Sequence, residues 1–412
     1  MSVALLACGL LAIALNLRIG VASIGPVLPE VRADLGLSPT AASLLTTVPI
    51  FAFGAFAFLT PALIRRLGLH RLLGVTVLAL AAGLVLRSFP GLVCLFAGTI
   101  VAGAAIAVAN VVMPAAIKRD FAHRAGLMLG LYSTALFLGA ALASGFTQPL
   151  VSASGHWRSA LAWWAAPAVL ALAVWLPQAL RSPGRTAGAH RVADAPSEAG
   201  EPPFRAVLKD PIALAVTALT GIQSLGYYAA LTWVPTLFKD HGMSAQNAGF
   251  LLSWSAFLGI AASLVAPAIA QRVRPTWLPI VFAAAITGVA YLGLALAPVS
   301  GAYAWMTLLG FGQGASISLS LSYLVWRSPD AHHTGHVSTM AQGFGYLFAG
   351  LGPVGLGALH STTGEWTVPL GALALLLVPQ VLTGVVASRE RHVLAGRSPR
   401  PAENPRITAR KG

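Results

Sequence analysis

Long apolar stretches alternate with short polar segments along the whole chain. A helix that crosses a bilayer needs about 20 mostly apolar residues, because the hydrocarbon core is about 30 Å thick. The pattern therefore predicts an all-α membrane protein. Stretches of this length predict twelve transmembrane helices, at residues 5–28, 42–63, 71–89, 91–117, 125–150, 159–179, 212–236, 247–270, 277–297, 302–326, 335–359 and 366–388.

The composition supports this prediction and excludes several classes of protein. Of the 412 residues, 57% are hydrophobic and 9% are charged, whereas a soluble globular protein has about 25% charged residues. A surface so poor in charge excludes an ordinary cytosolic enzyme. Only two cysteines are present, Cys8 and Cys94, and both lie in apolar stretches. This low number excludes a disulfide-rich secreted fold.

The basic residues predict how the chain is oriented. The formal net charge is +14, and 21 of the 26 Lys and Arg residues lie in alternate connections and in the C-terminal tail. Four, including Arg87, are assigned to the connections on the other side, and Arg18 lies inside the first span. Because cytoplasmic loops are enriched in Lys and Arg, we expect both termini in the cytoplasm. The basic segments are then expected to contact lipid headgroups and not nucleic acid.

The chain repeats part of its sequence at an offset of 206 residues. This offset relates the end of the first span, the following loop and the second span to the corresponding segments of spans seven and eight. Two similar six-helix halves in one orientation are typical of one large transporter architecture. The matched pairs are Pro29 with Pro235, Asp34 with Asp240, Gly36 with Gly242, Ser38 with Ser244, Ala42 with Ala248, Leu45 with Leu251, Pro61 with Pro267 and Arg66 with Arg272.

One long polar segment, Arg181–Asp210, separates the two sets of six spans and is rich in proline and glycine. Such a composition is typical of a linker. We therefore predict four regions. They are an N-terminal six-helix half at 1–180, a cytoplasmic linker at 181–211, a C-terminal six-helix half at 212–388 and a basic cytoplasmic tail at 389–412.

Several short strings resemble those of known transporters. The loop Pro61–Arg71 is similar to the signature loop of the major facilitator superfamily, although the usual acidic residue is missing. Within that superfamily the chain resembles the bacterial cyanate / 2-nitroimidazole transporter family. The strings that carry this resemblance are Leu15–Arg18, Ser23–Pro29, Ile117–Phe121, Gly130–Leu136, Tyr228–Pro235 and Met340–Tyr346.

The resemblance implies two pseudo-symmetric six-helix bundles in the bacterial inner membrane that work by alternating access. It implies a carrier for a small anion such as cyanate, or for a small heterocycle. The alternative within transport is an exporter of a neutral nitroheterocycle or drug-like molecule. The alternative from another class is a membrane-embedded sensor or enzyme, but the sequence has neither a catalytic constellation nor an attached soluble domain.

Arg18 is the strongest candidate for binding a solute. It lies about 3 Å from the midpoint of the first span, too deep for its side chain to reach the membrane surface. A charge facing lipid at this depth would cost about 2.5–3.5 kcal/mol or more. We therefore expect Arg18 to face a cavity and to bind an anionic group through its guanidinium. The alternative is a structural arginine paired with carbonyls and amides.

No acidic residue or histidine lies near the centre of a predicted span. A proton symporter needs a titratable group that alternates between the two sides. The sequence therefore favours facilitated diffusion or exchange. Coupling to protons through the substrate, or through Glu30 at the end of the first span, remains an alternative.

Uncharged polar residues at similar depths are further candidates. Amides and phenols orient a small polar ligand without adding a second charge, and the alternative is that they only bond neighbouring helices. Asn16 lies about 200° around the helix from Arg18 and is expected to point away. Residues four apart share a helix face. The candidates are Asn110, Tyr132, the pair Gln223 and Tyr227, and the pair Gln342 and Tyr346.

Glycine and proline mark where helices are expected to bend and gate. The candidates are Gly25 and Pro26 in the first span, and Gly352 and Pro353 in the eleventh. Broken helices are sites of movement in carriers, and the alternative is close helix packing. The sequence predicts no enzyme, no cofactor and no metal site. It predicts a monomer whose partners are a small solute and the lipid bilayer.

Overall fold

The structure is a computed structural model that describes residues 3–37, 39–181 and 204–395, and all structural statements below concern these residues. Every regular element in them is a helix. The predicted linker and tail fall mostly on residues 182–203 and 396–412, which lie outside the described residues.

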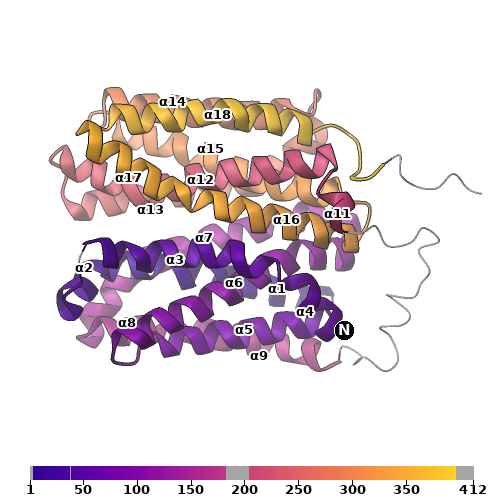
Figure 1. The fold of residues 1–412 in the computed structure, drawn as a ribbon, viewed down its shortest axis with the longest axis horizontal. Coiled ribbons are helices and arrows are strands. Elements are labelled where there is room, and N and C mark those ends of the chain that lie inside the picture. The colour runs from indigo at the N-terminus through magenta and orange to yellow at the C-terminus, as the bar shows by residue number, and fades with distance from the viewer. Residues whose placement is uncertain (1–2, 38, 182–203, 396–412) are drawn as a thin grey trace, which may run out of the picture.

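The N-terminal helices form one body (Figure 1, indigo to magenta). Within it, α1 packs against α7 and α9, and α5 packs against α6 and α9. The helices are α1 (Val3–Ala22), α2 (Ile24–Leu35), α3 (Pro39–Ala57), α4 (Thr60–Leu67), α5 (Leu69–Leu86), α6 (Leu92–Asp120), the short η1 (Ala122–Arg124), α7 (Ala125–Ser154), α8 (Trp157–Trp163) and α9 (Ala165–Arg181).

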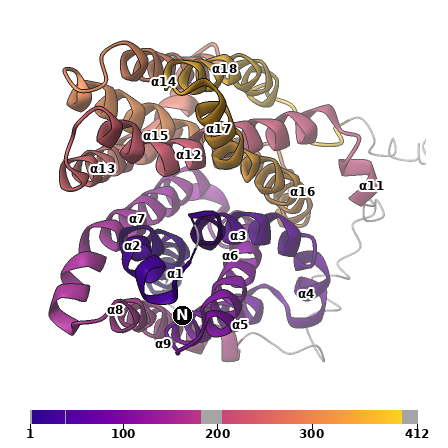
Figure 2. The ribbon, with the colours of Figure 1, turned by 60° about the vertical axis from the view of Figure 1, so that its left-hand side comes forward.

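The C-terminal helices form a second body beside the first, as Figure 2 shows from another side. Here α12 packs against α16 and α18, and α13 packs against α15. The helices are α11 (Phe204–Val207), α12 (Pro211–Asp240), α13 (Ala245–Arg272), α14 (Leu278–Leu296), α15 (Ala302–Trp326), α16 (Ala331–Ala349), α17 (Leu351–Thr363) and α18 (Thr367–Ala387).

The predicted spans all lie on helices, but several are broken. Ten helical segments in the described residues are long and apolar enough to cross a membrane, and the pair α3 and α4, bent by 58°, makes an eleventh. The predicted span 335–359 is divided at Gly350 between α16 and α17, and neither helix is among those segments. Hydropathy predicts that a chain crosses a membrane, but it does not predict whether the crossing is straight.

Local capping explains where the second body begins. Pro211 opens α12, a position where the missing N–H of proline costs nothing. Asp210 Oδ1 accepts hydrogen bonds from the backbone N–H groups of Ile212 and Ala213, at 2.9 and 3.0 Å. These bonds satisfy donors that the first turn of a helix leaves unpaired. The polar segment before this helix therefore ends in its cap.

The molecule has two ends. We call the end with α4 and α11 the α11 end, and the end with α2 and α8 the α8 end (Figure 1). The two bodies touch near the α11 end, where the rings of Phe58 and Phe344 meet edge to face at 5.0 Å. Lys118 Nζ donates to the Val325 carbonyl at 3.3 Å in the same region. These contacts close the space between the bodies at the α11 end.

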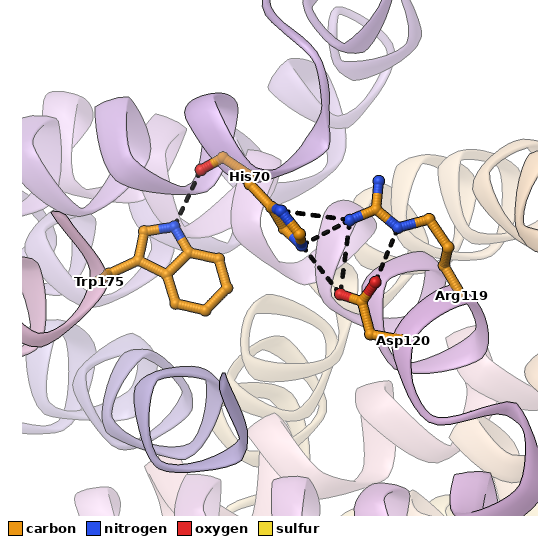
Figure 3. A network of polar contacts seen from close by, with 4 residues as sticks. All are labelled: His70, Arg119, Asp120 and Trp175. Carbon is orange, nitrogen blue, oxygen red and sulfur yellow. Dashed lines mark hydrogen bonds and ion pairs between the residues drawn. The ribbon is translucent and has the colours of Figure 1, made fainter. Parts of the chain in front are cut away.

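A polar network binds three helices of the first body together at the α11 end (Figure 3). His70 Nε2 lies 2.9 Å from Asp120 Oδ2, and Arg119 Nε donates to Asp120 Oδ1 at 2.8 Å. Trp175 Nε1 donates to the His70 carbonyl at 2.9 Å. His70 lies in the first turn of α5, and the carboxylate that it contacts is Asp120 at the end of α6.

Candidate functional site

Arg18 projects from α1 toward the opposite body. Its Nη1 donates a hydrogen bond to the Tyr228 hydroxyl on α12. The guanidinium carbon lies 5.4 Å from the ring centres of both Tyr227 and Tyr228, close enough for cation–π attraction. In the described part of the chain Arg18 forms no ion pair with a carboxylate. Its charge is therefore balanced only by dipoles and aromatic faces.

Arg18 lines a cavity of about 370 Å³ between the two bodies. Its walls come from α1 and α7 on one side and from α12, α15 and α16 on the other. Most of the lining side chains are polar, which is unusual for the interior of a membrane protein. The lining residues are Arg18, Tyr132, Leu136, Thr220, Gln223, Ser224, Tyr227, Ile317, Ser320, Leu321, Gln342 and Tyr346.

The structure brings the candidate binding residues together, although it leaves their role in binding a prediction. Six line the cavity: Arg18, Tyr132, Gln223, Tyr227, Gln342 and Tyr346. The seventh, Asn110, lies behind the wall, and its Oδ1 accepts a hydrogen bond from the Tyr132 hydroxyl at 3.2 Å. Asn110 therefore orients Tyr132.

Asn16 points away from the cavity, as helix rotation requires. Its Nδ2 donates to the carbonyls of Ala12 and Pro167, at 2.9 and 3.1 Å. Pro167 lies on α9 of the first body, whereas Arg18 bonds Tyr228 on α12 of the second body. The rotational argument from the sequence is thus confirmed for this residue.

Several residues around the site are not among those that the sequence predicts to bind a solute. Tyr228 is the hydrogen-bond partner of Arg18, and it opens one of the strings that carry the family resemblance. Thr220 Oγ1 and Ser320 Oγ lie 2.9 Å apart in the cavity wall. Ser320 belongs to an alternating run of serines that is buried on all sides in α15. Where every serine of a helix segment is buried, the polar pattern does not identify which of them face a cavity.

The candidate gating residues lie just after two helix breaks. Gly25 and Pro26 begin α2, and no atom lies within 4 Å of the position that a Cβ would take at Gly25. Gly352 and Pro353 begin α17, and a Cβ at Gly352 would lie 2.8 Å from the Leu225 carbonyl oxygen. Close packing therefore explains Gly352 but not Gly25. The gating role of all four residues stays a prediction.

Arg87 lies in the connection between α5 and α6, as predicted, but it does not face solvent. Its side chain is fully buried. It donates to the Gly20 carbonyl at 2.7 Å and to Ser23 Oγ at 2.8 Å. These acceptors lie where α1 ends, and a cation is favourable near the C-terminus of a helix. Arg87 follows directly after α5 and turns back into the protein, which loop position alone does not reveal.

A second cavity continues from the first toward the α8 end. It has a volume of about 500 Å³ and shares Tyr227 with the cavity around Arg18. Ser144, Leu231 and Leu252 contribute to its walls, and each lies in the part of its helix nearer the α8 end. The space between the bodies therefore extends from Arg18 toward the α8 end. This direction leads away from the contacts of Phe58 with Phe344 and of Lys118 with Val325.

Comparisons with known proteins identify relatives along almost the whole chain. The family model of the Major Facilitator Superfamily matches residues 7–393. The chain is 34% identical over 390 residues to "Uncharacterized transporter YycB" of Bacillus subtilis (strain 168), covering 93% of this chain and 94% of that protein. It is 34% identical to the 2-nitroimidazole transporter of Escherichia coli (strain K12), covering 94% and 96% of the two chains. It is 31% identical to the cyanate transport protein CynX of the same organism, covering 90% and 93%.

Solved structures show the same fold at lower identity. The proton:xylose symporter XylE, bound to 6-bromo-6-deoxy-D-glucose, has a TM-score of 0.69 at 17% identity and covers 93% of this chain and 94% of its own. The human organic anion transporter MFSD10 has a TM-score of 0.71 at 13% identity and covers 93% and 100%. At such identities the likeness concerns the fold alone.

Proposed function

The chain belongs to the major facilitator superfamily, a family of membrane transporters of small solutes, and we propose that it carries a small anion such as cyanate by alternating access. The observation that carries this proposal is Arg18, a cation in the cavity between the two bodies. Arg18 is surrounded by tyrosine rings and a tyrosine hydroxyl, and it has no carboxylate partner among the described residues. Proposals for orientation, coupling and substrate follow from this residue and its surroundings.

The electrostatics of the cavity favour an anion. An unneutralised charge away from water is costly, and an opposite charge at hydrogen-bond distance offsets that cost. A guanidinium binds a planar oxyanion through two parallel N–H donors. A bound anion would thus neutralise Arg18 and make closure of the cavity around it more favourable. Binding and the conformational change would be coupled by charge.

The arrangement of contacts supports an outward-facing conformation. The two bodies touch near the α11 end through Phe58 with Phe344 and through Lys118 with Val325. The cavities lead from Arg18 toward the α8 end. The basic residues predict that both termini lie on the cytoplasmic side of a bacterial inner membrane, so the α11 end is cytoplasmic. Solute would then enter from the periplasmic side in this state.

Transport by facilitated diffusion or exchange fits the residues around the cavity. The lining residues include Arg18 and several tyrosines but no Asp, Glu or His. Glu30, the acid nearest the first span, instead accepts a hydrogen bond from Gln148 Nε2 at 2.7 Å near the α8 end. Proton coupling would then need the substrate itself to carry the proton.

A second candidate is a neutral nitroheterocycle. Four tyrosines surround Arg18, and the rings of Tyr227, Tyr228 and Tyr346 contact one another edge to face. Such a surface stacks well with a flat ring, and a nitro group accepts hydrogen bonds as a carboxylate does. The relative that is a 2-nitroimidazole transporter has 34% identity.

Uptake into proteoliposomes separates the two candidates. The solutes are cyanate, nitrite, formate, small carboxylates and 2-nitroimidazole, tested with native protein, Arg18→Ala and the exposed-arginine control Arg32→Ala. We expect anion uptake to fall about thirtyfold or more in Arg18→Ala, because losing the partner of a buried charge costs about 2–5 kcal/mol. Arg32→Ala should behave as native protein. If neutral heterocycles enter equally with native protein and Arg18→Ala, Arg18 is structural and the second candidate replaces the first.

A further inference from the structure

Two amides in the cavity around Arg18 have polar atoms without a partner. Gln223 Nε2 and Gln342 Oε1 are buried, and neither has a hydrogen bond within the described residues. The two side chains belong to residues that are 5% and 2% exposed. Both line the cavity. They come from α12 and α16, two helices that pack against each other, so the cavity lining includes a free donor on one helix and a free acceptor on the other.

Other polar groups of the same cavity already have partners. Arg18 is bonded to Tyr228, Tyr132 to Asn110, and Thr220 to Ser320. Buried polar atoms are paired in most proteins, and an unpaired one is destabilising because it has lost its bonds to water without a replacement. The two free amide atoms differ from these paired groups, and a bound solute would remove the cost of leaving them unpaired.

The two amides require different hydrogen-bonding groups from a ligand. Gln223 Oε1 accepts from the Ser224 hydroxyl at 3.4 Å, which leaves its NH₂ group to donate to a ligand. Gln342 has no hydrogen bond to hold either orientation, so its amide presents an oxygen acceptor as well as a donor. An anion that has acceptors only satisfies Arg18 and Gln223. It leaves the Gln342 oxygen unpaired.

We propose that Gln342 selects solutes in which an N–H or O–H donor lies beside the oxyanion or nitro group bound by Arg18 and Gln223. This inference rests on the proposed function, and it narrows the substrate class to small solutes with both an acceptor end and a donor end. The cyanate ion carries no hydrogen and meets only half of this requirement. Gln342 is then a specificity-determining residue, and Arg18 is the anchor.

Matched ligands test this role of the donor. The anionic series is pyrrole-2-carboxylate, its 1-methyl derivative, which lacks the N–H, and its 4-methyl derivative, which has the same added bulk and keeps the N–H. The neutral series is 2-nitroimidazole with its 1-methyl and 4-methyl derivatives. Isothermal titration calorimetry on purified native protein in detergent gives Kd for each. We expect the 1-methyl compound of at least one series to bind about tenfold more weakly than its 4-methyl isomer, the loss of about one hydrogen bond.

Variants assign the effect to Gln342. Gln342→Met keeps the size of the side chain and removes the amide. The ratio of Kd between the 1-methyl and 4-methyl isomers should therefore fall from about ten to about one. Gln380→Met, at a buried glutamine of α18 that bonds Ser316 instead, should keep it. If Gln342→Met does not fold, Gln342→Glu retains an acceptor and should keep the preference in the neutral series.

Equal affinity for both isomers of each series in native protein would overturn the inference, and so would a preference that persists in Gln342→Met. The Arg18→Ala uptake experiment decides the proposed function separately. An N–H preference confined to the neutral series, with no anion transport, supports the role of Gln342 and overturns the anion proposal alone.

Discussion

The two halves supply different chemistry to one cavity. The N-terminal half contributes the charge through Arg18 and orients Tyr132 through Asn110. The C-terminal half contributes uncharged groups, above all the amides of Gln223 and Gln342. A solute that needs both must touch both halves at once. The comparison teaches that a repeated fold does not imply a repeated site, because the two halves place different side chains around one cavity.

The framework around the site is more symmetric than the site. Asp34 Oδ2 accepts from Trp157 Nε1 at 3.2 Å, and Asp240 Oδ2 accepts from Trp366 Nε1 at 3.0 Å. These aspartates are equivalent under the 206-residue offset. Each is followed by a glycine with positive φ, Gly36 at 60° and Gly242 at 85°. The turn between the first two spans is thus built alike in both halves.

Equivalent spans differ in shape. The second span of the N-terminal half bends by 58° between α3 and α4, whereas its counterpart α13 is one helix. Pro61 begins α4 near its first turn, but the matching Pro267 lies inside α13. The same proline therefore accompanies a break in one half and a continuous helix in the other. Tertiary packing decides which occurs.

The largest expected effect concerns an equivalent pair of glycines at helix crossings. A Cβ at Gly139 would lie 2.1 Å from the Leu15 carbonyl oxygen, whereas one at Gly345 would lie 3.3 Å from the Gly221 backbone. Gly139→Ala should therefore destabilise the protein by about 1–3 kcal/mol or more. Gly345→Ala should cost much less, because alanine also favours a helix by about 1 kcal/mol over glycine.

Unfolding of each variant by denaturant in detergent measures this difference. The exposed glycine Gly25, where an added methyl group would have no atom within 4 Å, provides Gly25→Ala as the control. Equal loss of stability in Gly139→Ala and Gly345→Ala would show that the two crossings tolerate a methyl group equally. It would contradict the expectation that the crossing at Gly139 is the tighter one.

An intermediate effect is expected from the tyrosines on either side of Arg18. Tyr228→Phe removes the hydroxyl that Arg18 bonds and leaves a buried charged donor unpaired, which costs about 1–3 kcal/mol. An anion restores a partner, so it should raise the unfolding temperature more in Tyr228→Phe than in native protein. Tyr132→Phe removes a bond to Asn110 only and leaves Arg18 bonded to Tyr228, so its anion-induced shift should differ from the native shift by less than that of Tyr228→Phe.

Thermal unfolding with and without a transported anion provides the measurement. A smaller anion-induced shift in Tyr228→Phe than in native protein would mean that Tyr228 binds the anion together with Arg18. The Tyr228 hydroxyl would then be a binding group for the anion, and not only a hydrogen-bond partner of Arg18.

The smallest effect concerns the paired aspartates at the α8 end. Arg158 Nη1 lies 2.7 Å from Asp34 Oδ2, and the hydrogen bond from this guanidinium holds the pKa of the Asp34 carboxyl below its ordinary value of 3.8. Asp240 lies 3.8 Å from His360 Nε2, too far for a hydrogen bond. Asp34→Asn should therefore lower the unfolding temperature slightly more than Asp240→Asn does at pH 7.

The pH dependence gives this prediction its sign. A carboxyl with a depressed pKa stabilises the fold above about pH 4 and loses that contribution as the pH falls further. The difference between native protein and Asp34→Asn should shrink from pH 7 to pH 3. Salt should reduce it as well, because the pair is partly exposed. A difference that grows on acidification would contradict the ion-pair account.

Much of the fold follows from local sequence. Each predicted span lies on helix, and the prediction of an all-α fold in the major facilitator superfamily is confirmed. The four-residue spacing of Gln223 with Tyr227, and of Gln342 with Tyr346, correctly placed each pair on one wall. Hydropathy and helical periodicity act over a few residues, so one sequence is enough to read them.

The contact partners of the polar residues could not be predicted from the sequence. Arg18 was visible as a charge that had to face the protein interior, because no neighbour in the chain could neutralise it. Its bond to Tyr228 joins residues 210 positions apart, and the buried position of Arg87 depends on a carbonyl 67 positions away. The sequence by itself determined which helices form, that they repeat, and that a cation lies in the membrane. Only the packing of one half against the other decided what surrounds that cation, because such contacts depend on the position of every helix at once.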